Sequence, residues 1–394
     1  MKSRFHFDFS TPEDAEALDR FAQRLKGTGY GHWPHKPDTL DGASREDEFP
    51  VRLRRILAGD GTEIRAQQDF YEHQLYIDKT PHAFVWPRGP LSEAVIDPKY
   101  AMYGFALLRH GLKLQPFQMA LAHLRLDVPP GSLFKGLGWK HELMPGFVYP
   151  VRPSKVFREL AFFRASPKRR RLGILANLSG ASLGLGLGLA MHHRLTRSNG
   201  PYEVIECESF GTWADDVWAE TLPYYKALTR RDAAAMNRLY EPGDTRFQRY
   251  RIRREGEDVG WFMTTRRRMS GHPSWGNLHT GVILDALAKP EYASDILRLA
   301  KEALLEHSVD VIISYWSHSD WKKAARRLAF IPRTSGFYLF VSKAGQKHVL
   351  TDECPLDAMH FTRSDCDGAD TFAPPSPRDP KPDIRMTSKG KGDS

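Results

Sequence analysis

Glu72, His73 and Glu93 are side chains of the first half of the chain whose types suit acceptance of a proton. A carboxylate or a neutral imidazole can act as a general base, and an imidazole titrates close to neutral pH. Glu72 and His73 lie in residues 63–85, where polar and apolar residues interleave as in two antiparallel strands. All three are candidate catalytic bases. The alternative for each is structural: a solvated carboxylate at a strand edge for Glu93, and a surface strand for the other two.

The elements that must position these residues follow a recognisable order. The spacing of apolar residues predicts a strand at 5–9, a helix at 15–25, a short helix at 51–57 and two strands within 63–85. A strand at 91–96, a helix at 103–114, an extended segment at 119–126, a short helix at 131–137 and a last strand at 147–151 follow. Residues 202–345 repeat this order with little residue identity.

This order, met twice, resembles the GNAT acyltransferase fold, and the local match is best at 94–108. The fourth strand of that family ends in a pattern like V-x-P-x-Y-R-G-x-G-x-G/A-x-x-L-L, and this chain reads VIDPKYAMYGFALL from Val95. Gly104 and Ala106 take the glycine and small-residue positions, whereas Ala101 replaces the usual Arg or Gln. The resemblance implies an α+β protein of two tandem GNAT-like domains. Each would be a mixed, mostly antiparallel sheet flanked by helices.

The resemblance also implies an acyl-CoA co-substrate and the residues that hold it. Backbone groups of the fourth strand would bind the pantetheine arm. N–H groups at the positive end of the next helix would bind the pyrophosphate, and glycine would let the phosphate approach. These implied cofactor residues are Ala94, Val95, Ile96, Ala101, Met102, Tyr103, Gly104, Phe105 and Ala106. Residues 133–140 resemble the last helix of the family, with Phe134 in place of a frequent general-acid tyrosine, which excludes that acid here.

The second half matches the cofactor pattern less well. Residues 285–295 contain no glycine, and Glu291 and Asp295 would repel phosphates there. The second half is therefore expected to keep the fold with a degenerate cofactor turn.

Residues 168–194 set the two halves apart. Four basic residues precede LGILANLSGASLGLGLGLAM, twenty residues without charge that contain five glycines. Glycine every four residues makes a smooth helical face. We expect a helix packed between the domains; the alternatives are contact with a membrane surface and a membrane span.

Composition bears on the partners, the compartment and the metal content of the protein. The chain has 394 residues and a net charge of +9, which favours anionic partners, although no nucleic-acid motif accompanies it. Three scattered cysteines and the absence of a signal-peptide pattern favour the cytoplasm. The histidines lack metal-ligand spacing, so no metal is expected. Residues 374–394 lack apolar anchors and are predicted to be disordered.

The sequence thus predicts a first GNAT-like domain at 1–165, a connecting segment at 166–200, a second domain at 201–373 and a tail at 374–394. The predicted function is acyl transfer from an acyl-CoA to a small amine, an amino sugar or an envelope polysaccharide precursor. The alternative is a non-catalytic binding or scaffold protein built from degenerate acyltransferase folds, with possible peripheral membrane contact through 168–194.

Overall fold

The computed structural model describes residues 6–26, 28, 51–127, 130–196, 200–334 and 336–366. The predicted disordered tail lies outside the described residues. Three sheets and their flanking helices give a mixed α+β architecture, as predicted. One sheet has the order β1-β2-β3-β9-β16 with β4 paired to β3, a second has the order β14-β7-β13-β12-β11-β10-β8, and a third has the order β5-β15-β6.

The first half and the connecting segment contain seven strands and seven helices among the described residues. The strands are β1 (His6–Phe9), β2 (Arg52–Gly59), β3 (Ile64–Ile77), β4 (Thr80–Ser92), β5 (Met119–His123), β6 (Lys140–Leu143) and β7 (Gly146–Pro150). The helices are α1 (Ala15–Arg24), α2 (Ala101–Leu114), α3 (Gly131–Gly136), α4 (Pro153–Glu159), α5 (Ala161–Arg164), α6 (Pro167–Leu178) and α7 (Ala181–Thr196).

The second half repeats the strand and helix order of the first, with β9, α9 and β16 added. Its strands are β8 (Tyr202–Cys207), β9 (Ala227–Thr229), β10 (Phe247–Arg254), β11 (Glu257–Arg268), β12 (His279–Ala288), β13 (Val311–Tyr315), β14 (Ile331–Arg333), β15 (Phe337–Val341) and β16 (Met359–His360). Its helices are α8 (Thr212–Thr221), α9 (Ala233–Leu239), α10 (Ala293–Glu306) and α11 (Ser319–Arg327).

Tight turns form two hairpins, one of which joins the two strands predicted within 63–85. Asp78 and Lys79 join β3 to β4 with φ of 46° and 70°, and Glu255 and Gly256 join β10 to β11 with φ of 53° and 90°. Two successive residues with positive φ match the right-handed twist of the paired strands, which is why such turns are common in hairpins.

Two predicted elements are wrong. Residues 51–57 form most of β2 rather than a helix, because pairing with β3 places Arg54 beside Glu72 and Arg55 beside Asp69. The strand predicted at 91–96 ends at Ser92, and a short 3₁₀ turn at Glu93–Val95 follows.

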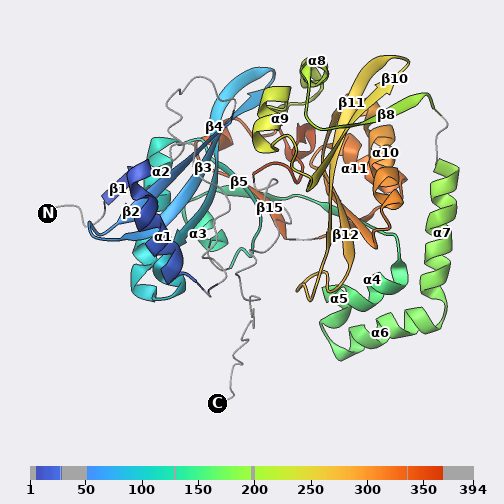
Figure 1. The fold of residues 1–394 in the computed structure, drawn as a ribbon, viewed down its shortest axis with the longest axis horizontal. Coiled ribbons are helices and arrows are strands. Elements are labelled where there is room, and N and C mark those ends of the chain that lie inside the picture. Colours follow the sequence, from blue (N-terminus) through green and yellow to red (C-terminus); the bar gives the residue numbers. More distant parts are fainter. Residues whose placement is uncertain are drawn as a thin grey trace.

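The two halves exchange a strand, as Figure 1 shows for β15 beside β5. β7 pairs with β13 and β14 of the second half, while β15 lies between β5 and β6 of the first. Residues 147–151 are thus a strand, as predicted, but in the sheet of the other half. Because each half completes a sheet of the other, separating them would break hydrogen-bonded ladders in both.

A buried apolar cluster fills the space between the halves. Leu75, Phe84 and Trp86 come from the first half, and Val282 and Ile313 come from the second. Each such side chain contributes about 1.5–3 kcal/mol when it is fully buried. The cluster therefore holds the face of β3 and β4 firmly against the second half.

The segment at 172–191 differs from its prediction. It contains two helices, α6 and α7, and they lie along the outer side of the second half, not between the halves (Figure 1). A side chain added at Gly184 or Gly188 would meet nothing within 4 Å, so the smooth glycine face points away from the protein. Within the described residues no single helix is long and apolar enough to cross a membrane, and only α6 and α7 together, bent by 66°, reach that length.

Candidate active site

β4 separates from β5 halfway along its length. The Val85 amide donates to the Phe117 carbonyl over 3.1 Å, and Val85 and Gln118 form an isolated parallel bridge. Beyond this bridge β4 still pairs with β3, whereas β5 pairs with β15. Among the described residues, no strand pairs with the other edge of β4 at 86–92. We call this separation of β4 at 86–92 from β5 the first divergence.

The sequence of β4 explains the first divergence. Amides alternate in direction along a strand, so the next amide that would face β5 after Val85 belongs to Pro87, which has no N–H. Gly89, with φ of +88°, lies at the register shift between the pairs Gln67–Leu91 and Asp69–Arg88. A bulge of this kind bends a strand and ends its pairing.

A two-part turn connects the first divergence to α2. A 3₁₀ turn at Glu93–Val95 is followed by another at Pro98–Tyr100, and α2 begins at Ala101. The Asp97 side chain accepts a hydrogen bond from the Lys99 amide over 3.1 Å, as an N-cap should. Val95, Ile96 and Met102 expose 44%, 51% and 57% of their surface, so the turn presents an apolar surface beside the helix end.

The implied cofactor residues are distributed differently from the expectation. Ala94, Val95 and Ile96 lie in and just after the first 3₁₀ turn, and the strand positions beside β5 belong to residues 86–92 instead. Ala101 and Met102 are exposed at the start of α2, whereas Tyr103, Phe105 and Ala106 are partly buried along it.

Close packing between α2 and β4 explains why position 104 is a glycine. A Cβ at this buried position would lie 3.2 Å from the Ser92 Oγ and 3.4 Å from the Ser92 Cβ. The glycine therefore lets α2 pack closely on the end of β4. The expectation that it faces a phosphate does not match this geometry.

Glu93 is held by two guanidinium groups. Its side chain is 4% exposed, one oxygen accepts from Arg24 Nε, and the other accepts from Arg65 Nη1 over 2.8 Å. Arg24 comes from α1 and Arg65 from β3, so Glu93 ties both elements to the turn. With both oxygens engaged and little access to solvent, this carboxylate is a structural anchor and a poor candidate for the base.

Glu72 and His73 point to opposite faces of β3. Glu72 shares the face of Phe70, under α2, and pairs with Arg54 over 3.1 Å and with Arg52 over 3.8 Å. His73 shares the face of Tyr71, which packs in the cluster between the halves. The sequence offered both residues as candidate bases, and the alternation of the strand puts them on opposite faces.

His73 is buried, and this burial lowers its pKa to about 4. Its Nδ1 accepts a hydrogen bond from the Gln74 amide over 2.9 Å. The same Nδ1 lies 3.1 Å from the Gln74 carbonyl, so either tautomer finds a partner in Gln74. At neutral pH His73 is therefore uncharged.

A small cavity of about 10 Å³ lies between the halves, beside His73. This volume suits about one water molecule. Its walls come from β3, β4, β9, α9 and the segment that ends the described chain. The lining residues are Tyr71, His73, Trp86, Thr229, Arg230, Arg231, Met236, Leu239, Ser364, Asp365 and Cys366.

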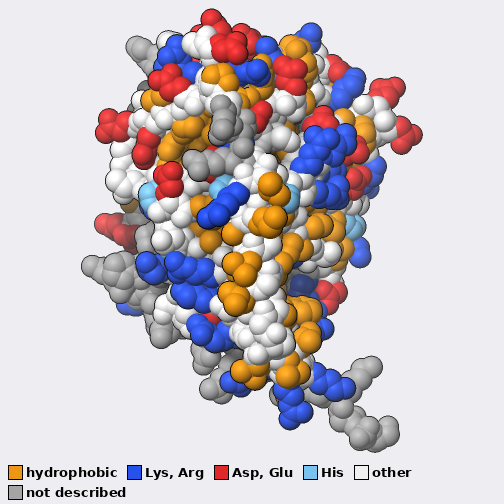
Figure 2. Space-filling model, turned by 90° about the vertical axis from the view of Figure 1, so that its right-hand side faces the viewer, with side chains coloured by type: hydrophobic (Ala, Val, Ile, Leu, Met, Phe, Trp, Pro, Cys, Tyr) orange, Lys and Arg blue, Asp and Glu red, His pale blue; other side chains and the backbone are white. Residues whose placement is uncertain are grey.

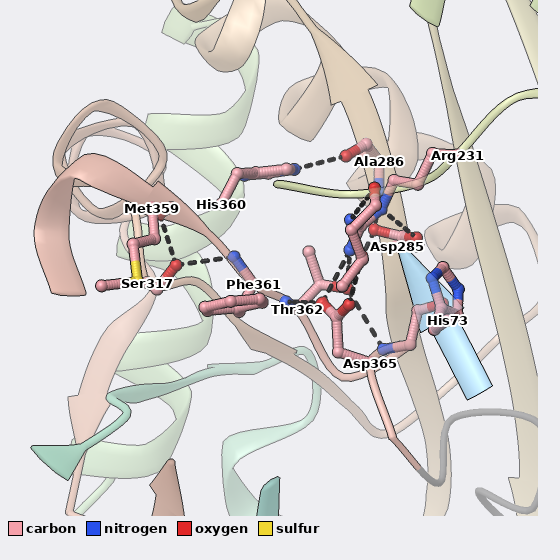
Figure 3. A network of polar contacts seen from close by, with 12 residues as sticks. His73, Arg231, Asp285, Ala286, Ser317, Met359, His360, Phe361, Thr362 and Asp365 are labelled. Atoms are coloured by element: carbon pink, nitrogen blue, oxygen red, sulfur yellow. Dashed lines mark hydrogen bonds and ion pairs between the residues drawn. The ribbon is translucent and has the colours of Figure 1, made fainter. Parts of the chain in front are cut away.

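A buried ionic cluster forms one wall of this cavity (Figure 3). Arg231, whose side chain is 2% exposed, donates from Nε to Asp285 over 2.9 Å and from Nη2 to Asp365 over 2.7 Å. The Thr229 hydroxyl donates to Asp365 over 2.6 Å, and the Thr362 hydroxyl donates to Asp285 over 2.9 Å. Burial raises the pKa of Asp285, while Arg231 opposes that shift.

β12 and β13 of the second half also diverge, after Val282 and Ile313, but this second divergence is filled. Residues 359–364 occupy it. The Ser364 amide donates to the Leu284 carbonyl over 3.1 Å, and His360 Nε2 donates to the Ala286 carbonyl over 2.8 Å.

The same segment is held on the β13 side as well. The Ser317 amide donates to the Phe361 carbonyl over 3.1 Å, and the Phe361 amide donates to the Ser317 hydroxyl over 2.7 Å. Residues 359–364 thus bridge β12 and the end of β13. The chain itself takes the place that a bound ligand would need.

Sequence reasoning missed the ionic cluster. Asp285 gave a usable signal, because it is the one charged residue in the apolar run VILDALA at 282–288, and a buried charge requires a partner. Nothing in the sequence indicated that Arg231 joins Asp285 to Asp365, since it lies 54 positions from Asp285 and 134 from Asp365. In the described part of the chain, no group of three or more His, Cys, Asp or Glu side chains is placed to hold a metal ion.

Neither a protein-family model nor a curated protein matches the sequence. Solved structures do match the fold. A probable N-acyltransferase from Enterococcus faecalis V583 matches with a TM-score of 0.51 and 8% identity, over 87% of this chain and 73% of that one. A GCN5-related N-acetyltransferase from Anabaena variabilis ATCC 29413 matches with a TM-score of 0.52 and 10% identity, over 86% of this chain and 72% of that one.

A Saccharomyces cerevisiae N-myristoyltransferase with bound myristoyl-CoA and inhibitors is also similar. Its TM-score is 0.50 at 9% identity, over 92% of this chain and 87% of that one. These likenesses confirm the predicted GNAT resemblance at the level of the fold. Each match extends over most of this chain and therefore over parts of both of its halves.

Proposed function

We propose that this protein transfers an acyl group from an acyl-CoA to an amine, and that the donor binds in the first divergence. One observation carries the assignment to this half. The second divergence is filled by residues 359–364, whereas the edge of β4 at 86–92 pairs with no strand of the described chain. An extended pantetheine arm is suited to such an edge, because its amides can exchange hydrogen bonds with a strand.

The start of α2 supports the position of the pyrophosphate. Its first turn contains no acidic residue, and backbone N–H groups at a helix start attract anions. Ala101 and Met102 are exposed there, and the neighbouring Lys99 is exposed as well. Asp97 pairs with Lys99 over 2.6 Å, so a bound phosphate would compete with this carboxylate for the lysine.

The acceptor would reach the thioester from the side of the second half, beside His73 and Trp86. The amine nitrogen forms a bond to the thioester carbon, the carbon–sulfur bond breaks, and the amine proton leaves with the coenzyme A thiol. Alignment of the two reactants and backbone N–H groups of β4 facing the oxyanion would supply most of the rate enhancement. His73 is uncharged at neutral pH and would contact the acceptor through a hydrogen bond. Small amines, amino sugars and envelope polysaccharide precursors are the acceptor classes to test.

A non-catalytic binding protein is the second candidate. Pro87 removes a backbone N–H from the strand expected to hold the donor, and the cavity between the halves, of about 10 Å³, is too small for an acceptor unless side chains move. Binding of acyl-CoA without turnover of any tested amine would favour this candidate.

Calorimetric titration with acetyl-CoA and with myristoyl-CoA tests the donor site. Met102→Glu puts a negative charge in the exposed first turn of α2 and should weaken binding about tenfold, the effect of one like charge near a phosphate in a largely aqueous setting. Leu114→Glu, at the exposed far end of the same helix, is the matched control and should leave the affinity within about twofold. Equal affinity of both variants, or no binding by the unmodified protein, would contradict the proposal.

A further inference from the structure

α6 and α7 expose an apolar face that no part of the described chain covers. Leu183, Leu187, Met191 and Leu195 recur every four residues along α7 and expose 67%, 64%, 64% and 75% of their surface. This spacing places them in one stripe on the helix. Leu189, by contrast, packs against the core of the second half. On α6, Leu172, Ile174, Leu175 and Leu178 are exposed by 49–79%.

This exposure is concentrated on the connecting segment. Eight of the seventeen exposed large hydrophobic side chains in the described chain lie on these two helices. Figure 2 shows the apolar side chains running along this side of the molecule, with Lys and Arg gathered around one end of the stripe. A contiguous apolar surface of this kind marks an interaction site.

The charged residues of this segment itself all have one sign. Residues 160–196 contain Arg164, Lys168, Arg169, Arg170, Arg171 and Arg194, and no Asp or Glu. Arg169, Arg170 and Arg171 are exposed on the first turns of α6, next to the apolar residues. An apolar stripe on a segment whose own charges are all cationic complements a surface that is apolar beneath and anionic above.

We infer that α6 and α7 dock the protein on the surface of a membrane that contains anionic lipid. The exposed leucines would enter the boundary between headgroups and acyl chains, and the arginines would contact lipid phosphates. The 66° bend between the helices suits two short helices lying in a membrane surface. In Figure 1 the pair lies on the opposite side of the molecule from β3, β4 and α2, so docking would leave the first divergence accessible.

Vesicle sedimentation of the full chain tests this inference independently of acyl transfer. The protein should sediment with phosphatidylcholine vesicles in which phosphatidylglycerol makes up about a third of the lipid, and not with phosphatidylcholine alone. Leu183→Ser, Leu187→Ser and Met191→Ser together should weaken vesicle binding by about tenfold or more, since each removes apolar area from the contact. Leu114→Ser, Val204→Ser and Ile331→Ser, which change exposed apolar residues elsewhere, are the matched control.

The charge contribution has its own pair of variants. Arg169→Gln, Arg170→Gln and Arg171→Gln should weaken binding about fivefold per cation removed, and added salt should have a similar effect. Lys323→Gln, Arg326→Gln and Arg327→Gln on α11 are the matched control. The inference is overturned if the unmodified protein ignores anionic vesicles or if both triple variants of α6 and α7 bind as well as their controls. A concentration-dependent dimer that the serine variant abolishes, without vesicle binding, would assign the face to a second copy instead.

Discussion

Replacing Arg231 by methionine removes the one cation from the ionic cluster between the halves. Asp285 and Asp365 would remain buried, with exposed side-chain fractions of 0% and 3%. Removing one partner of a buried ion pair costs about 3–5 kcal/mol, because the remaining charge is uncompensated. For a chain of this length unfolding as one unit, about 4 kcal/mol corresponds to a fall in Tm of about 5 °C.

The loss should depend on pH in a defined direction. Burial already raises the pKa of Asp285 in the folded protein, and removal of Arg231 takes away the charge that opposes that shift. A carboxyl group whose folded pKa is raised destabilises the protein at pH values above its unfolded pKa, and the effect disappears as the pH falls to the unfolded pKa. The deficit of Arg231→Met should therefore be largest near pH 7 and shrink as the pH falls toward about 4, the pKa of an unfolded aspartate.

Urea unfolding followed by tryptophan fluorescence, repeated across this pH range, measures the effect. Arg230→Met is the matched control: this neighbour is partly exposed and pairs with Asp232, so its loss should cost less than about 1 kcal/mol. Changing both aspartates to asparagine in the Arg231→Met variant should recover part of the loss. A deficit below about 1 kcal/mol at pH 7, or one that grows on acidification, would refute the reasoning.

Three further predictions concern the candidate site. The pKa of His73 falls to about 4 on folding, so stability that is present above about pH 6.5 is lost as the pH drops toward 4. In denaturation curves, His73→Asn should reduce that loss by up to about 3 kcal/mol. An unchanged dependence of stability on pH would contradict the buried state of His73. Gly104→Ala should cost about 1–3 kcal/mol by crowding the end of β4, whereas Gly136→Ala, with nothing within 4 Å, should be neutral or stabilising. Glu93→Gln should lower stability by about 2 kcal/mol and reduce activity only in proportion to the fraction unfolded. A stable variant without activity would instead identify Glu93 as the catalytic base.

Local patterns predicted most elements of this fold. Alternation identified the β3–β4 hairpin, and helical spacing identified α1 and α2. β2 was missed because its arginines gain partners only when β3 lies beside them. Such long-range pairing overrides local preference.

The strand exchange could not be read from local patterns. Alternation indicates that 147–151 form a strand, but it does not say which sheet receives it. β7 pairs with residues more than 160 positions away in β13, and the choice between partners depends on the whole assembled sheet.

The sequence predicted a turn and a helix after the fourth strand, but not which residues lie beside β5. The turn and helix after the fourth strand are present, yet the strand ends at Ser92, so the residues beside β5 are displaced from those expected. Glu93 has the chemistry of a base, and only the structure shows Arg24, 69 positions away, and Arg65 engaging it. Spacing along the sequence cannot reveal such neighbours.

Hydrogen–deuterium exchange with and without acetyl-CoA tests the central claim most directly, because it distinguishes the two divergences in one measurement. Binding in the first divergence should slow exchange in peptides that cover 86–104 and leave those that cover 284–292 and 359–364 unchanged. Protection at 284–292, or release of 359–364 on binding, would place the donor in the second half and contradict the account.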